Sequence, residues 1–83
     1  MEFNYKTQGT CAREIAFEIV DGKVQNVQFF GGCNGNLKGI GALVEGMGID
    51  EVIARVDGIR CGSKVTSCPD QLAAALKAAK NHL

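Results

Sequence analysis

The stretch AREIAFEIVDGKVQNVQFFGG, residues 12–32, decides the fold because it holds two strand patterns on either side of a turn signal. Apolar and polar residues alternate in 12–20 and again in 23–32, as expected for half-buried strands. Asp21-Gly22 between them is a strong signal for an antiparallel hairpin. The expected inward-facing residues are Ile15, Phe17, Ile19, Val27 and Phe29.

The length of the turn determines which residues of the two strands lie opposite each other. A two-residue turn at Asp21-Gly22 would pair Phe17 with Asn26, which mixes apolar and polar side chains on one face. A three-residue loop over 20–22 keeps most of the apolar face together. We therefore predict the three-residue loop.

This register also predicts where the first two cysteines lie. It pairs Ile15 with Val27, and it pairs Cys11 with Gly31. Since Cys33 follows Gly31 closely, we expect Cys11 and Cys33 to meet at the open end of the hairpin.

One more strand pattern and three helix patterns flank the hairpin. Residues 1–8 alternate like a strand, and helical spacing of apolar residues marks 33–48, 49–59 and 67–83. Strands followed by helices imply an α+β fold. We expect a small antiparallel β-sheet, built from the N-terminal strand plus the hairpin, with two or three helices packed on one face. The length of 83 residues suits a single domain, 1–83.

The helix patterns also predict helix ends and inward faces. Asp50 would cap the second helix, and Cys68 would cap the third, with Pro69 at its first position. The inward stripe of the first helix would comprise Leu37, Ile40, Leu43, Val44 and Met47.

Composition and charge exclude several classes of function. Nine basic and nine acidic residues give a net charge of zero without a Lys/Arg run, so neither nucleic acid nor an anionic membrane is an expected partner. The first residues lack the apolar core of a signal peptide, and no apolar stretch is long enough to span a bilayer. Serine-protease, phosphate-loop and dinucleotide signatures are absent. We therefore expect a cytoplasmic protein, in which thiols stay reduced.

The candidate functional residues are the four cysteines, Cys11, Cys33, Cys61 and Cys68. In a reducing compartment such residues point to metal binding or redox chemistry more than to disulfides. Cys33 and Cys68 each stand where a predicted helix begins, and helix N-termini stabilise thiolates. Four thiolates can close a zinc site or hold an iron–sulfur cluster. Because no Cys-x-x-Cys pair is present, tertiary folding would have to assemble the site.

Three interpretations of the cysteines stay open, and we favour the first, in which all four hold zinc or an iron–sulfur cluster. In the second, Cys61 and Cys68 cycle between dithiol and disulfide, with Cys68 as the nucleophile. In the third, the cysteines are buried packing residues. Residues that could support the metal site through backbone or side-chain contacts are Gly32, Asn34, Gly62, Lys64 and Asp70.

The chain resembles a known family. The segment GIRCGSKVTSCPDQLAAAL, residues 58–76, resembles the TSCPD domain, which is named for the signature found here at residues 66–70. FFGGCNGNLKGI and GTCAREI are similar to other motifs of that family, so the resemblance runs from about residue 3 to residue 77. Similar domains occur at the C-terminal end of cobalamin-dependent ribonucleotide reductases. The resemblance implies cysteines that bind metal or support thiol redox chemistry.

The resemblance also bears on partners and activity. Ribonucleotide reduction needs a large barrel, a radical source and a nucleotide site, which 83 residues cannot supply. The isolated chain is therefore not expected to be an enzyme. The resemblance implies an accessory or docking module, or a thiol redox module, that serves ribonucleoside-diphosphate reductase or another redox enzyme in DNA precursor synthesis. A homodimer also stays open.

A second resemblance, in layout, is to the U-type iron–sulfur scaffold proteins. All the cysteines except Cys61 fall where the three scaffold cysteines would. The aspartate that follows the first scaffold cysteine is replaced here by Ala12 and Arg13. The added thiol and the missing aspartate imply tight structural binding more than cluster transfer.

Overall fold

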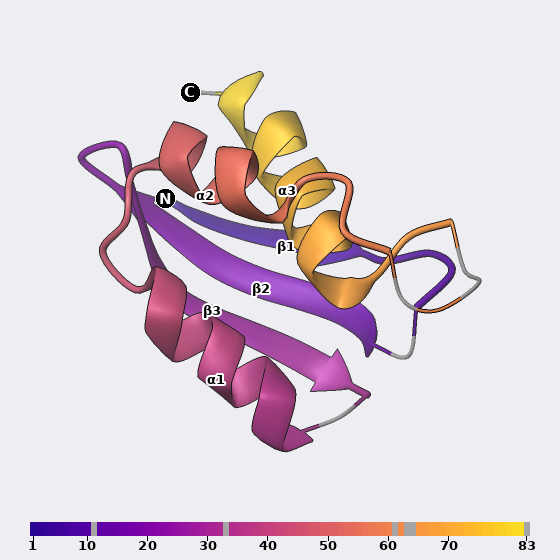
Figure 1. Ribbon diagram of the computed structural model, residues 1–83. Coiled ribbons are helices and arrows are strands. Elements are labelled where there is room, and N and C mark those ends of the chain that lie inside the picture. Colours follow the sequence, from indigo (N-terminus) through magenta and orange to yellow (C-terminus); the bar gives the residue numbers. More distant parts are fainter. Residues whose placement is uncertain (11, 33, 61, 63–64, 83) are drawn as a thin grey trace.

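The computed structural model describes residues 1–10, 12–32, 34–60, 62 and 65–82. In chain order the elements are β1 (Glu2–Lys6), β2 (Ala12–Val20), β3 (Lys23–Gly31), α1 (Asn34–Val44), α2 (Ile49–Val56) and α3 (Cys68–Lys80) (Figure 1). This order confirms the predicted α+β class. Within the described ranges, no helix has both the length and the apolar character needed to cross a membrane.

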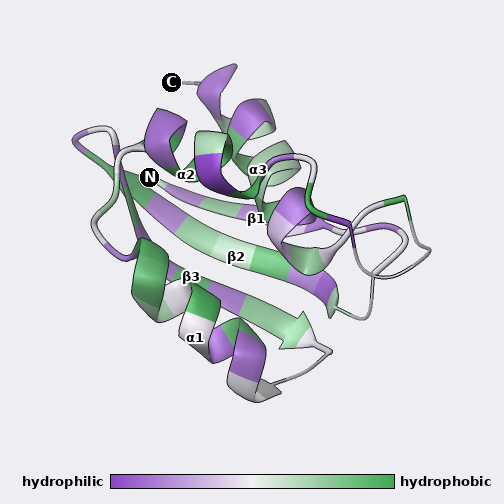
Figure 2. Cartoon of the chain, in the orientation of Figure 1, coloured by the Kyte–Doolittle hydropathy of each residue, from purple (hydrophilic) through white to green (hydrophobic). Residues whose placement is uncertain are grey.

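The strands form one antiparallel sheet in the order β1-β2-β3. Along β1, Phe3 and Tyr5 are half-buried while their neighbours are exposed, as the alternating pattern predicted. The ring of Phe3 stacks on that of Phe17 in β2, with 5.5 Å between the ring centroids. Figure 2 shows hydrophobic and hydrophilic segments following one another along β2 and β3, which gives the sheet one apolar face.

All three helices contribute to one core on that apolar face. The cluster joins β2 and β3 to each helix, and its members are Ile15, Phe17, Ile19, Val24, Val44, Ile49, Val52, Leu72, Ala75, Leu76 and Ala79. α1 lies along β3 (Figure 1), and at Gly41 an added Cβ atom would stand 2.8 Å from the carbonyl oxygen of Val27. The absence of a Cβ atom at Gly41 therefore permits the close approach of α1 to the sheet.

The predicted three-residue hairpin loop is wrong. Val20 pairs with Lys23, so Asp21 and Gly22 alone form the turn. Their φ angles are +53° and +75°. Two positive φ values in succession are what a tight type I′ turn requires.

A bulge in β3 explains how the two-residue turn keeps the apolar face together. The register shifts between Ala16 and Glu18, and Asn26, with φ +54°, supplies the extra residue. Beyond the bulge Ile15 lies opposite Phe29, so the predicted pairing of Ile15 with Val27 is wrong. The prediction failed because it assumed an uninterrupted ladder, whereas one left-handed asparagine changes the register.

Three predictions about the helices are also wrong. The residue that caps α2 is Gly48, and Asp50 stands in the first turn, where its carboxylate pairs with Lys80. The N-cap of α3 is Ser67, whose hydroxyl is a stronger acceptor than the thiol of Cys68. Leu43 is 79% exposed, because it projects beyond the arc of α1 that faces the sheet.

Candidate functional site

The signature segment at the start of α3 carries the two buried polar side chains of the described chain. Thr66 is 7% exposed and Ser67 is 4% exposed. The hydroxyl of Ser67 accepts a hydrogen bond from Asp70 N at 3.1 Å, which caps the helix. The same hydroxyl donates to the carbonyl oxygen of Ile59 at 2.6 Å. Ser67 therefore joins the cap of α3 to the segment that follows α2.

The Asp70 carboxylate makes a second link to that segment. It accepts a hydrogen bond from Gly58 N at 2.6 Å and another from the Thr66 hydroxyl at 2.5 Å. The bond from Thr66 lowers the pKa of Asp70 most, and the bond from Gly58 lowers it further. The positive charges of Lys77 and Arg60 act in the same direction. Asp70 is therefore held as a carboxylate that ties Gly58 to α3.

Gln71 and Thr66 link the same helix end to the loop between β1 and β2. The Gln71 amide donates to the Thr66 hydroxyl at 3.0 Å and accepts from Gln8 N at 3.1 Å. At Gly9 an added Cβ atom would stand 3.1 Å from the Thr66 methyl group, so the loop packs directly on the signature.

The same loop is bonded to the first residues of β2. Thr10 donates its hydroxyl hydrogen to the carbonyl oxygen of Ala12 at 3.0 Å, and the Thr7 hydroxyl donates to the same oxygen. Ala12 in turn lies opposite Gly31, the last residue of β3. The ends of β2 and β3 are therefore fixed to each other and to the loop.

The candidate site residues are only partly described. Cys68 is half-buried and is the first residue of α3. Gly32 and Gly62 have left-handed backbone, with φ +78° and +58°, and both are exposed. Asp70 holds the network described above, and Asn34 is the first residue of α1. Outside the described residues lie Cys11, Cys33, Cys61, Lys64 and the side chain of Asn34.

The convergence predicted for the cysteines can be followed only through their described neighbours. Thr10 and Ala12 flank the first cysteine, Gly32 precedes the second, and Arg60 and Gly62 flank the third. The segments that contain these neighbours lie at the end of the sheet where α3 begins (Figure 1). The predicted pairing of Cys11 with Gly31 rested on the wrong register, since Ala12 is the partner of Gly31. Within residues 1–10, 12–32, 34–60, 62 and 65–82, no three His, Cys, Asp or Glu residues form a metal-binding group.

Sequence reasoning missed three members of this network. It treated Thr66, Ser67 and Gln71 only as part of a motif. Ser67 and Gln71 bond to other loops, and Thr66 bonds to Asp70 and Gln71 within the segment itself. One signal was available for Ser67. A serine followed three residues later by an acidic residue, just before an apolar run, is a pattern typical of a helix start. No local pattern indicates that Gln71 reaches Gln8.

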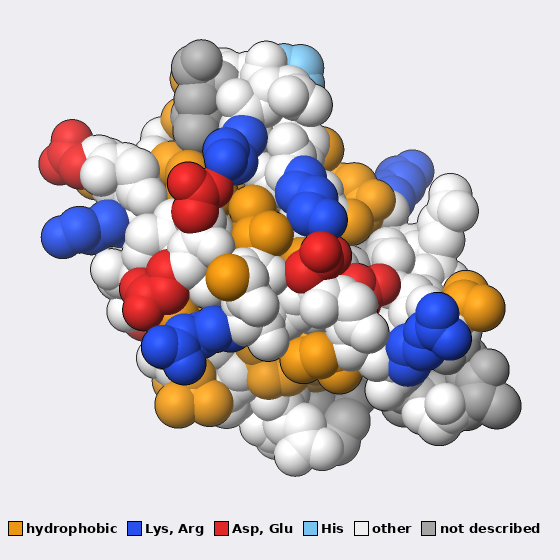
Figure 3. Space-filling view, turned by 45° about the horizontal axis from the view of Figure 1, so that its top comes forward, with side chains coloured by type: hydrophobic (Ala, Val, Ile, Leu, Met, Phe, Trp, Pro, Cys, Tyr) orange, Lys and Arg blue, Asp and Glu red, His pale blue; other side chains and the backbone are white. Residues whose placement is uncertain are grey.

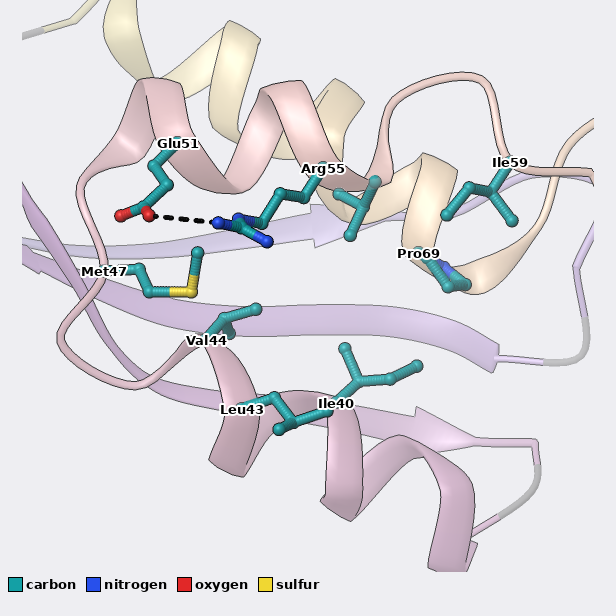
Figure 4. A pocket seen from close by; sticks show the side chains of 9 residues that line it. Ile40, Leu43, Val44, Met47, Glu51, Arg55, Ile59 and Pro69 are labelled. Carbon is teal, nitrogen blue, oxygen red and sulfur yellow. Dashed lines mark ion pairs between the residues drawn. The ribbon is translucent and has the colours of Figure 1, made fainter.

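A second feature is an apolar groove between α1 and α2, with a volume of about 440 Å³ (Figure 4). Leu43, Met47 and Pro69 are among the side chains that line it, and Arg55 and Glu51 form an ion pair of 3.6 Å at its border. Pro69 directly follows Cys68, so the groove reaches the start of α3.

Charged side chains of opposite sign lie next to one another over the helices (Figure 3). Lys80 of α3 pairs with Asp50 in the first turn of α2. Lys77 of α3 pairs with Asp57, the C-cap residue of α2, at 2.9 Å. All of these side chains are substantially exposed, so each pair contributes about 0–1 kcal/mol.

A family model described as the TSCPD domain matches residues 3–80, which is nearly the whole chain. Neither the curated proteins nor the solved structures contain a match to the chain.

Proposed function

The chain belongs to the TSCPD domain family, and from this membership we propose that it is a small metal-binding module. Four cysteine thiolates would hold either one zinc ion or an iron–sulfur cluster. The proposed ligands are Cys11, Cys33, Cys61 and Cys68.

The observation that carries the proposal is the bonding among the segments next to the cysteines. Asp70 holds Gly58, Ser67 holds Ile59, and Gln71 holds Gln8. Each of these bonds starts from the N-cap or the first turn of α3, where Cys68 stands. Since the ends of β2 and β3 also pair there, all four cysteine-bearing segments lead to one end of the fold. A site without a local Cys-x-x-Cys pair requires such an arrangement.

The donor set fits the proposed metal groups. Thiolates bind zinc in closed tetrahedral sites, and they are the usual ligands of iron–sulfur clusters. Gly31, Gly32 and Gly62 adopt positive φ angles close to two of the proposed ligands in sequence. Turns of this kind direct main-chain N–H groups outward, where they can donate to a sulfur atom. Such a closed site would supply structural cross-linking of the loops.

Membership of the family also supports a narrower role. The family is linked to ribonucleotide reductase at the level of the family as a whole. We infer an accessory module that docks on that enzyme or on another redox enzyme. The alternative within this role is a Cys61/Cys68 dithiol that passes electrons to the reductase, and a scaffold that carries a cluster is a third form.

Elemental analysis of protein purified without oxygen tests the proposal, together with an absorption spectrum and a titration of free thiols. One zinc per chain without visible absorption would support a closed structural site. Iron with broad visible absorption would support a cluster. A folded protein that holds no metal and has four titratable thiols would contradict metal binding and leave redox chemistry or packing.

Matched serine variants separate ligands from bystanders. Cys68→Ser should lose the metal, because oxygen of a serine is a poor replacement for a thiolate ligand. The control is Ala78→Ser, which places the same side chain on an exposed position of the same helix. We expect the control to keep its full metal content. Equal metal content in both variants would remove Cys68 from the ligand set.

A further inference from the structure

The two outer strands of the sheet differ in what covers their free edges. Along β3, Val24 N donates to the carbonyl oxygen of Met47 at 2.8 Å, and Gly46 N donates to the carbonyl oxygen of Val24 at 2.7 Å. Farther along, Asn26 N donates to the Glu45 carboxylate at 2.9 Å. The connection between α1 and α2 therefore protects this edge from Val24 to Asn26.

The main-chain hydrogen bonds of β1 show which residues face its free edge. Met1 and Ile19 exchange both of their bonds, at 2.9 and 3.0 Å, and Thr7 N donates to the carbonyl oxygen of Arg13 at 3.1 Å. In an antiparallel ladder such bonded pairs alternate with unbonded ones. The main-chain groups that point away from β2 are therefore those of Glu2, Asn4 and Lys6. Among the described residues, none bonds to these groups.

We propose that the free edge of β1 binds a second copy of this chain and forms a two-fold symmetric dimer. An antiparallel β1–β1 pair centred on Asn4 places Glu2 opposite the second copy's Lys6, and Lys6 opposite its Glu2. The strand is therefore complementary to itself in charge, which an isologous interface requires.

The main-chain geometry agrees with this register. Centring on Asn4 pairs Asn4 with itself and Glu2 with Lys6, which are the residues whose N–H and C=O groups face outward. These pairs then become the hydrogen-bonded pairs of the new ladder. A shift by one residue would put inward-facing groups of β1 opposite outward-facing groups of the second copy.

The aromatic side chains of β1 gain partners in the same register. Phe3 of one copy lies opposite Tyr5 of the other, and both residues are only half-buried in the single chain. Aromatic cross-strand pairs at unbonded positions are close enough to stabilise a sheet. The dimer would extend the apolar face of the sheet across the two-fold axis.

Helix α3 leaves room for a second copy beside β1. Gln71 bonds to Gln8, which follows β1, so this flank of α3 faces the β1 side of the molecule. Ala74 and Ala78 follow Gln71 at helical spacing and share its flank. Small side chains there allow the α3 helices of the two copies to approach across the axis.

Size-exclusion chromatography with light scattering tests the proposal, on the full chain with reductant present and no N-terminal tag. Wild type should have twice the mass of the chain. Glu2→Lys and Lys6→Glu should each weaken the dimer by about tenfold, because two like-charge pairs replace two attractive ones. The double variant Glu2→Lys/Lys6→Glu restores both pairs and should recover the dimer. Lys38→Glu, at an exposed position of α1, makes the same charge change as Lys6→Glu and should leave the dimer unaffected.

A proline at the centre of the strand provides an independent test. Asn4→Pro removes an outward N–H group and leaves the bonds to β2 in place, so a folded monomer is the expected result. Circular dichroism verifies that this variant is folded. A wild-type chain that is monomeric up to about 1 mM would overturn the proposal, since the dissociation constant expected for the β1–β1 dimer lies below this concentration. A wild-type dimer that survives both single charge reversals would also overturn it, because the interface would lie elsewhere.

Discussion

The two ends of the three-stranded sheet are closed by different kinds of contact. At the hairpin end, main-chain groups close the structure, with Val24 bonded to both Met47 and Gly46. At the opposite end, side chains of the signature segment do this, chiefly Asp70 and Gln71. Main-chain closure depends little on which side chains are present. Side-chain closure depends on particular residues, and it is found in the segments that carry the cysteines in the sequence.

This difference suggests why the signature residues are needed. The loops at this second end belong to segments far apart in the chain, and Ser67, Asp70 and Gln71 hold them with few bonds. A small domain has little apolar surface to spare for such loops. A bound metal would add the cross-links that the core does not supply.

The largest expected effect is that of metal removal. Chelation of the proposed metal should lower the free energy of unfolding by at least about 4 kcal/mol, because binding and folding are coupled in small metal domains. Amide hydrogen exchange at 7–10 and 58–60 should accelerate more than exchange at Val24, which lies in the hairpin end. Equal acceleration at both ends would show that the metal does not act locally. Unchanged exchange would contradict a metal site at this end.

The next largest effect is expected from Asp70→Ala. The variant leaves the Gly58 and Thr66 donors without their acceptor, which should cost about 2 kcal/mol. Urea denaturation measures the change. The matched control at the hairpin end is Glu45→Ala, which removes a carboxylate that accepts one exposed main-chain bond from Asn26. That variant should cost about 0.5 kcal/mol, and equal costs would contradict the contrast between the two ends.

A smaller effect is expected from Asn26→Ala at the bulge. Alanine at φ +54° is strained by about 1 kcal/mol, whereas Asn26→Gly adopts this backbone without strain. The glycine variant should therefore be the more stable of the two in thermal unfolding. If both variants lose the same stability, the hydrogen bond from the Asn26 side chain to Glu18, rather than the backbone geometry, holds the bulge.

The smallest effect is expected from Leu43→Ser. Leu43 is 79% exposed, so the substitution should change the free energy of unfolding by less than about 0.5 kcal/mol. On the same helix Leu37 is 6% exposed, and Leu37→Ala should cost about 2–4 kcal/mol. Thermal unfolding of both variants provides the comparison. A large loss for Leu43→Ser would mean that the groove between α1 and α2 is closed in solution.

The sequence was sufficient to predict the fold class and most of the apolar face. Alternation gave β1 and β2, and the α+β order followed from strands that precede helices. The register was not predictable in the same way. Whether Asn26 is an ordinary strand residue or a left-handed bulge depends on the ladder on both sides of it, which a local pattern does not include.

The candidate site was predictable in part. Asp70 was predicted as a residue that could support the metal site. The structure gives it two hydrogen bonds, and its role toward a metal stays a prediction. The role of Gln71 could not be predicted, because its partner Gln8 stands far away in the chain. Cap positions were misassigned by one residue at α3, since a cysteine and a serine stand side by side at Ser67 and Cys68. The ligand roles of the cysteines remain a prediction.

X-ray absorption spectroscopy of the metal in the purified protein tests the central claim most directly. The proposal predicts a shell of four sulfur atoms, at about 2.3 Å if the metal is zinc. Cys68→Ser should reduce the sulfur count of any metal that remains bound. A shell of nitrogen and oxygen atoms, or two sulfur atoms at most, would contradict a site built from the four cysteines.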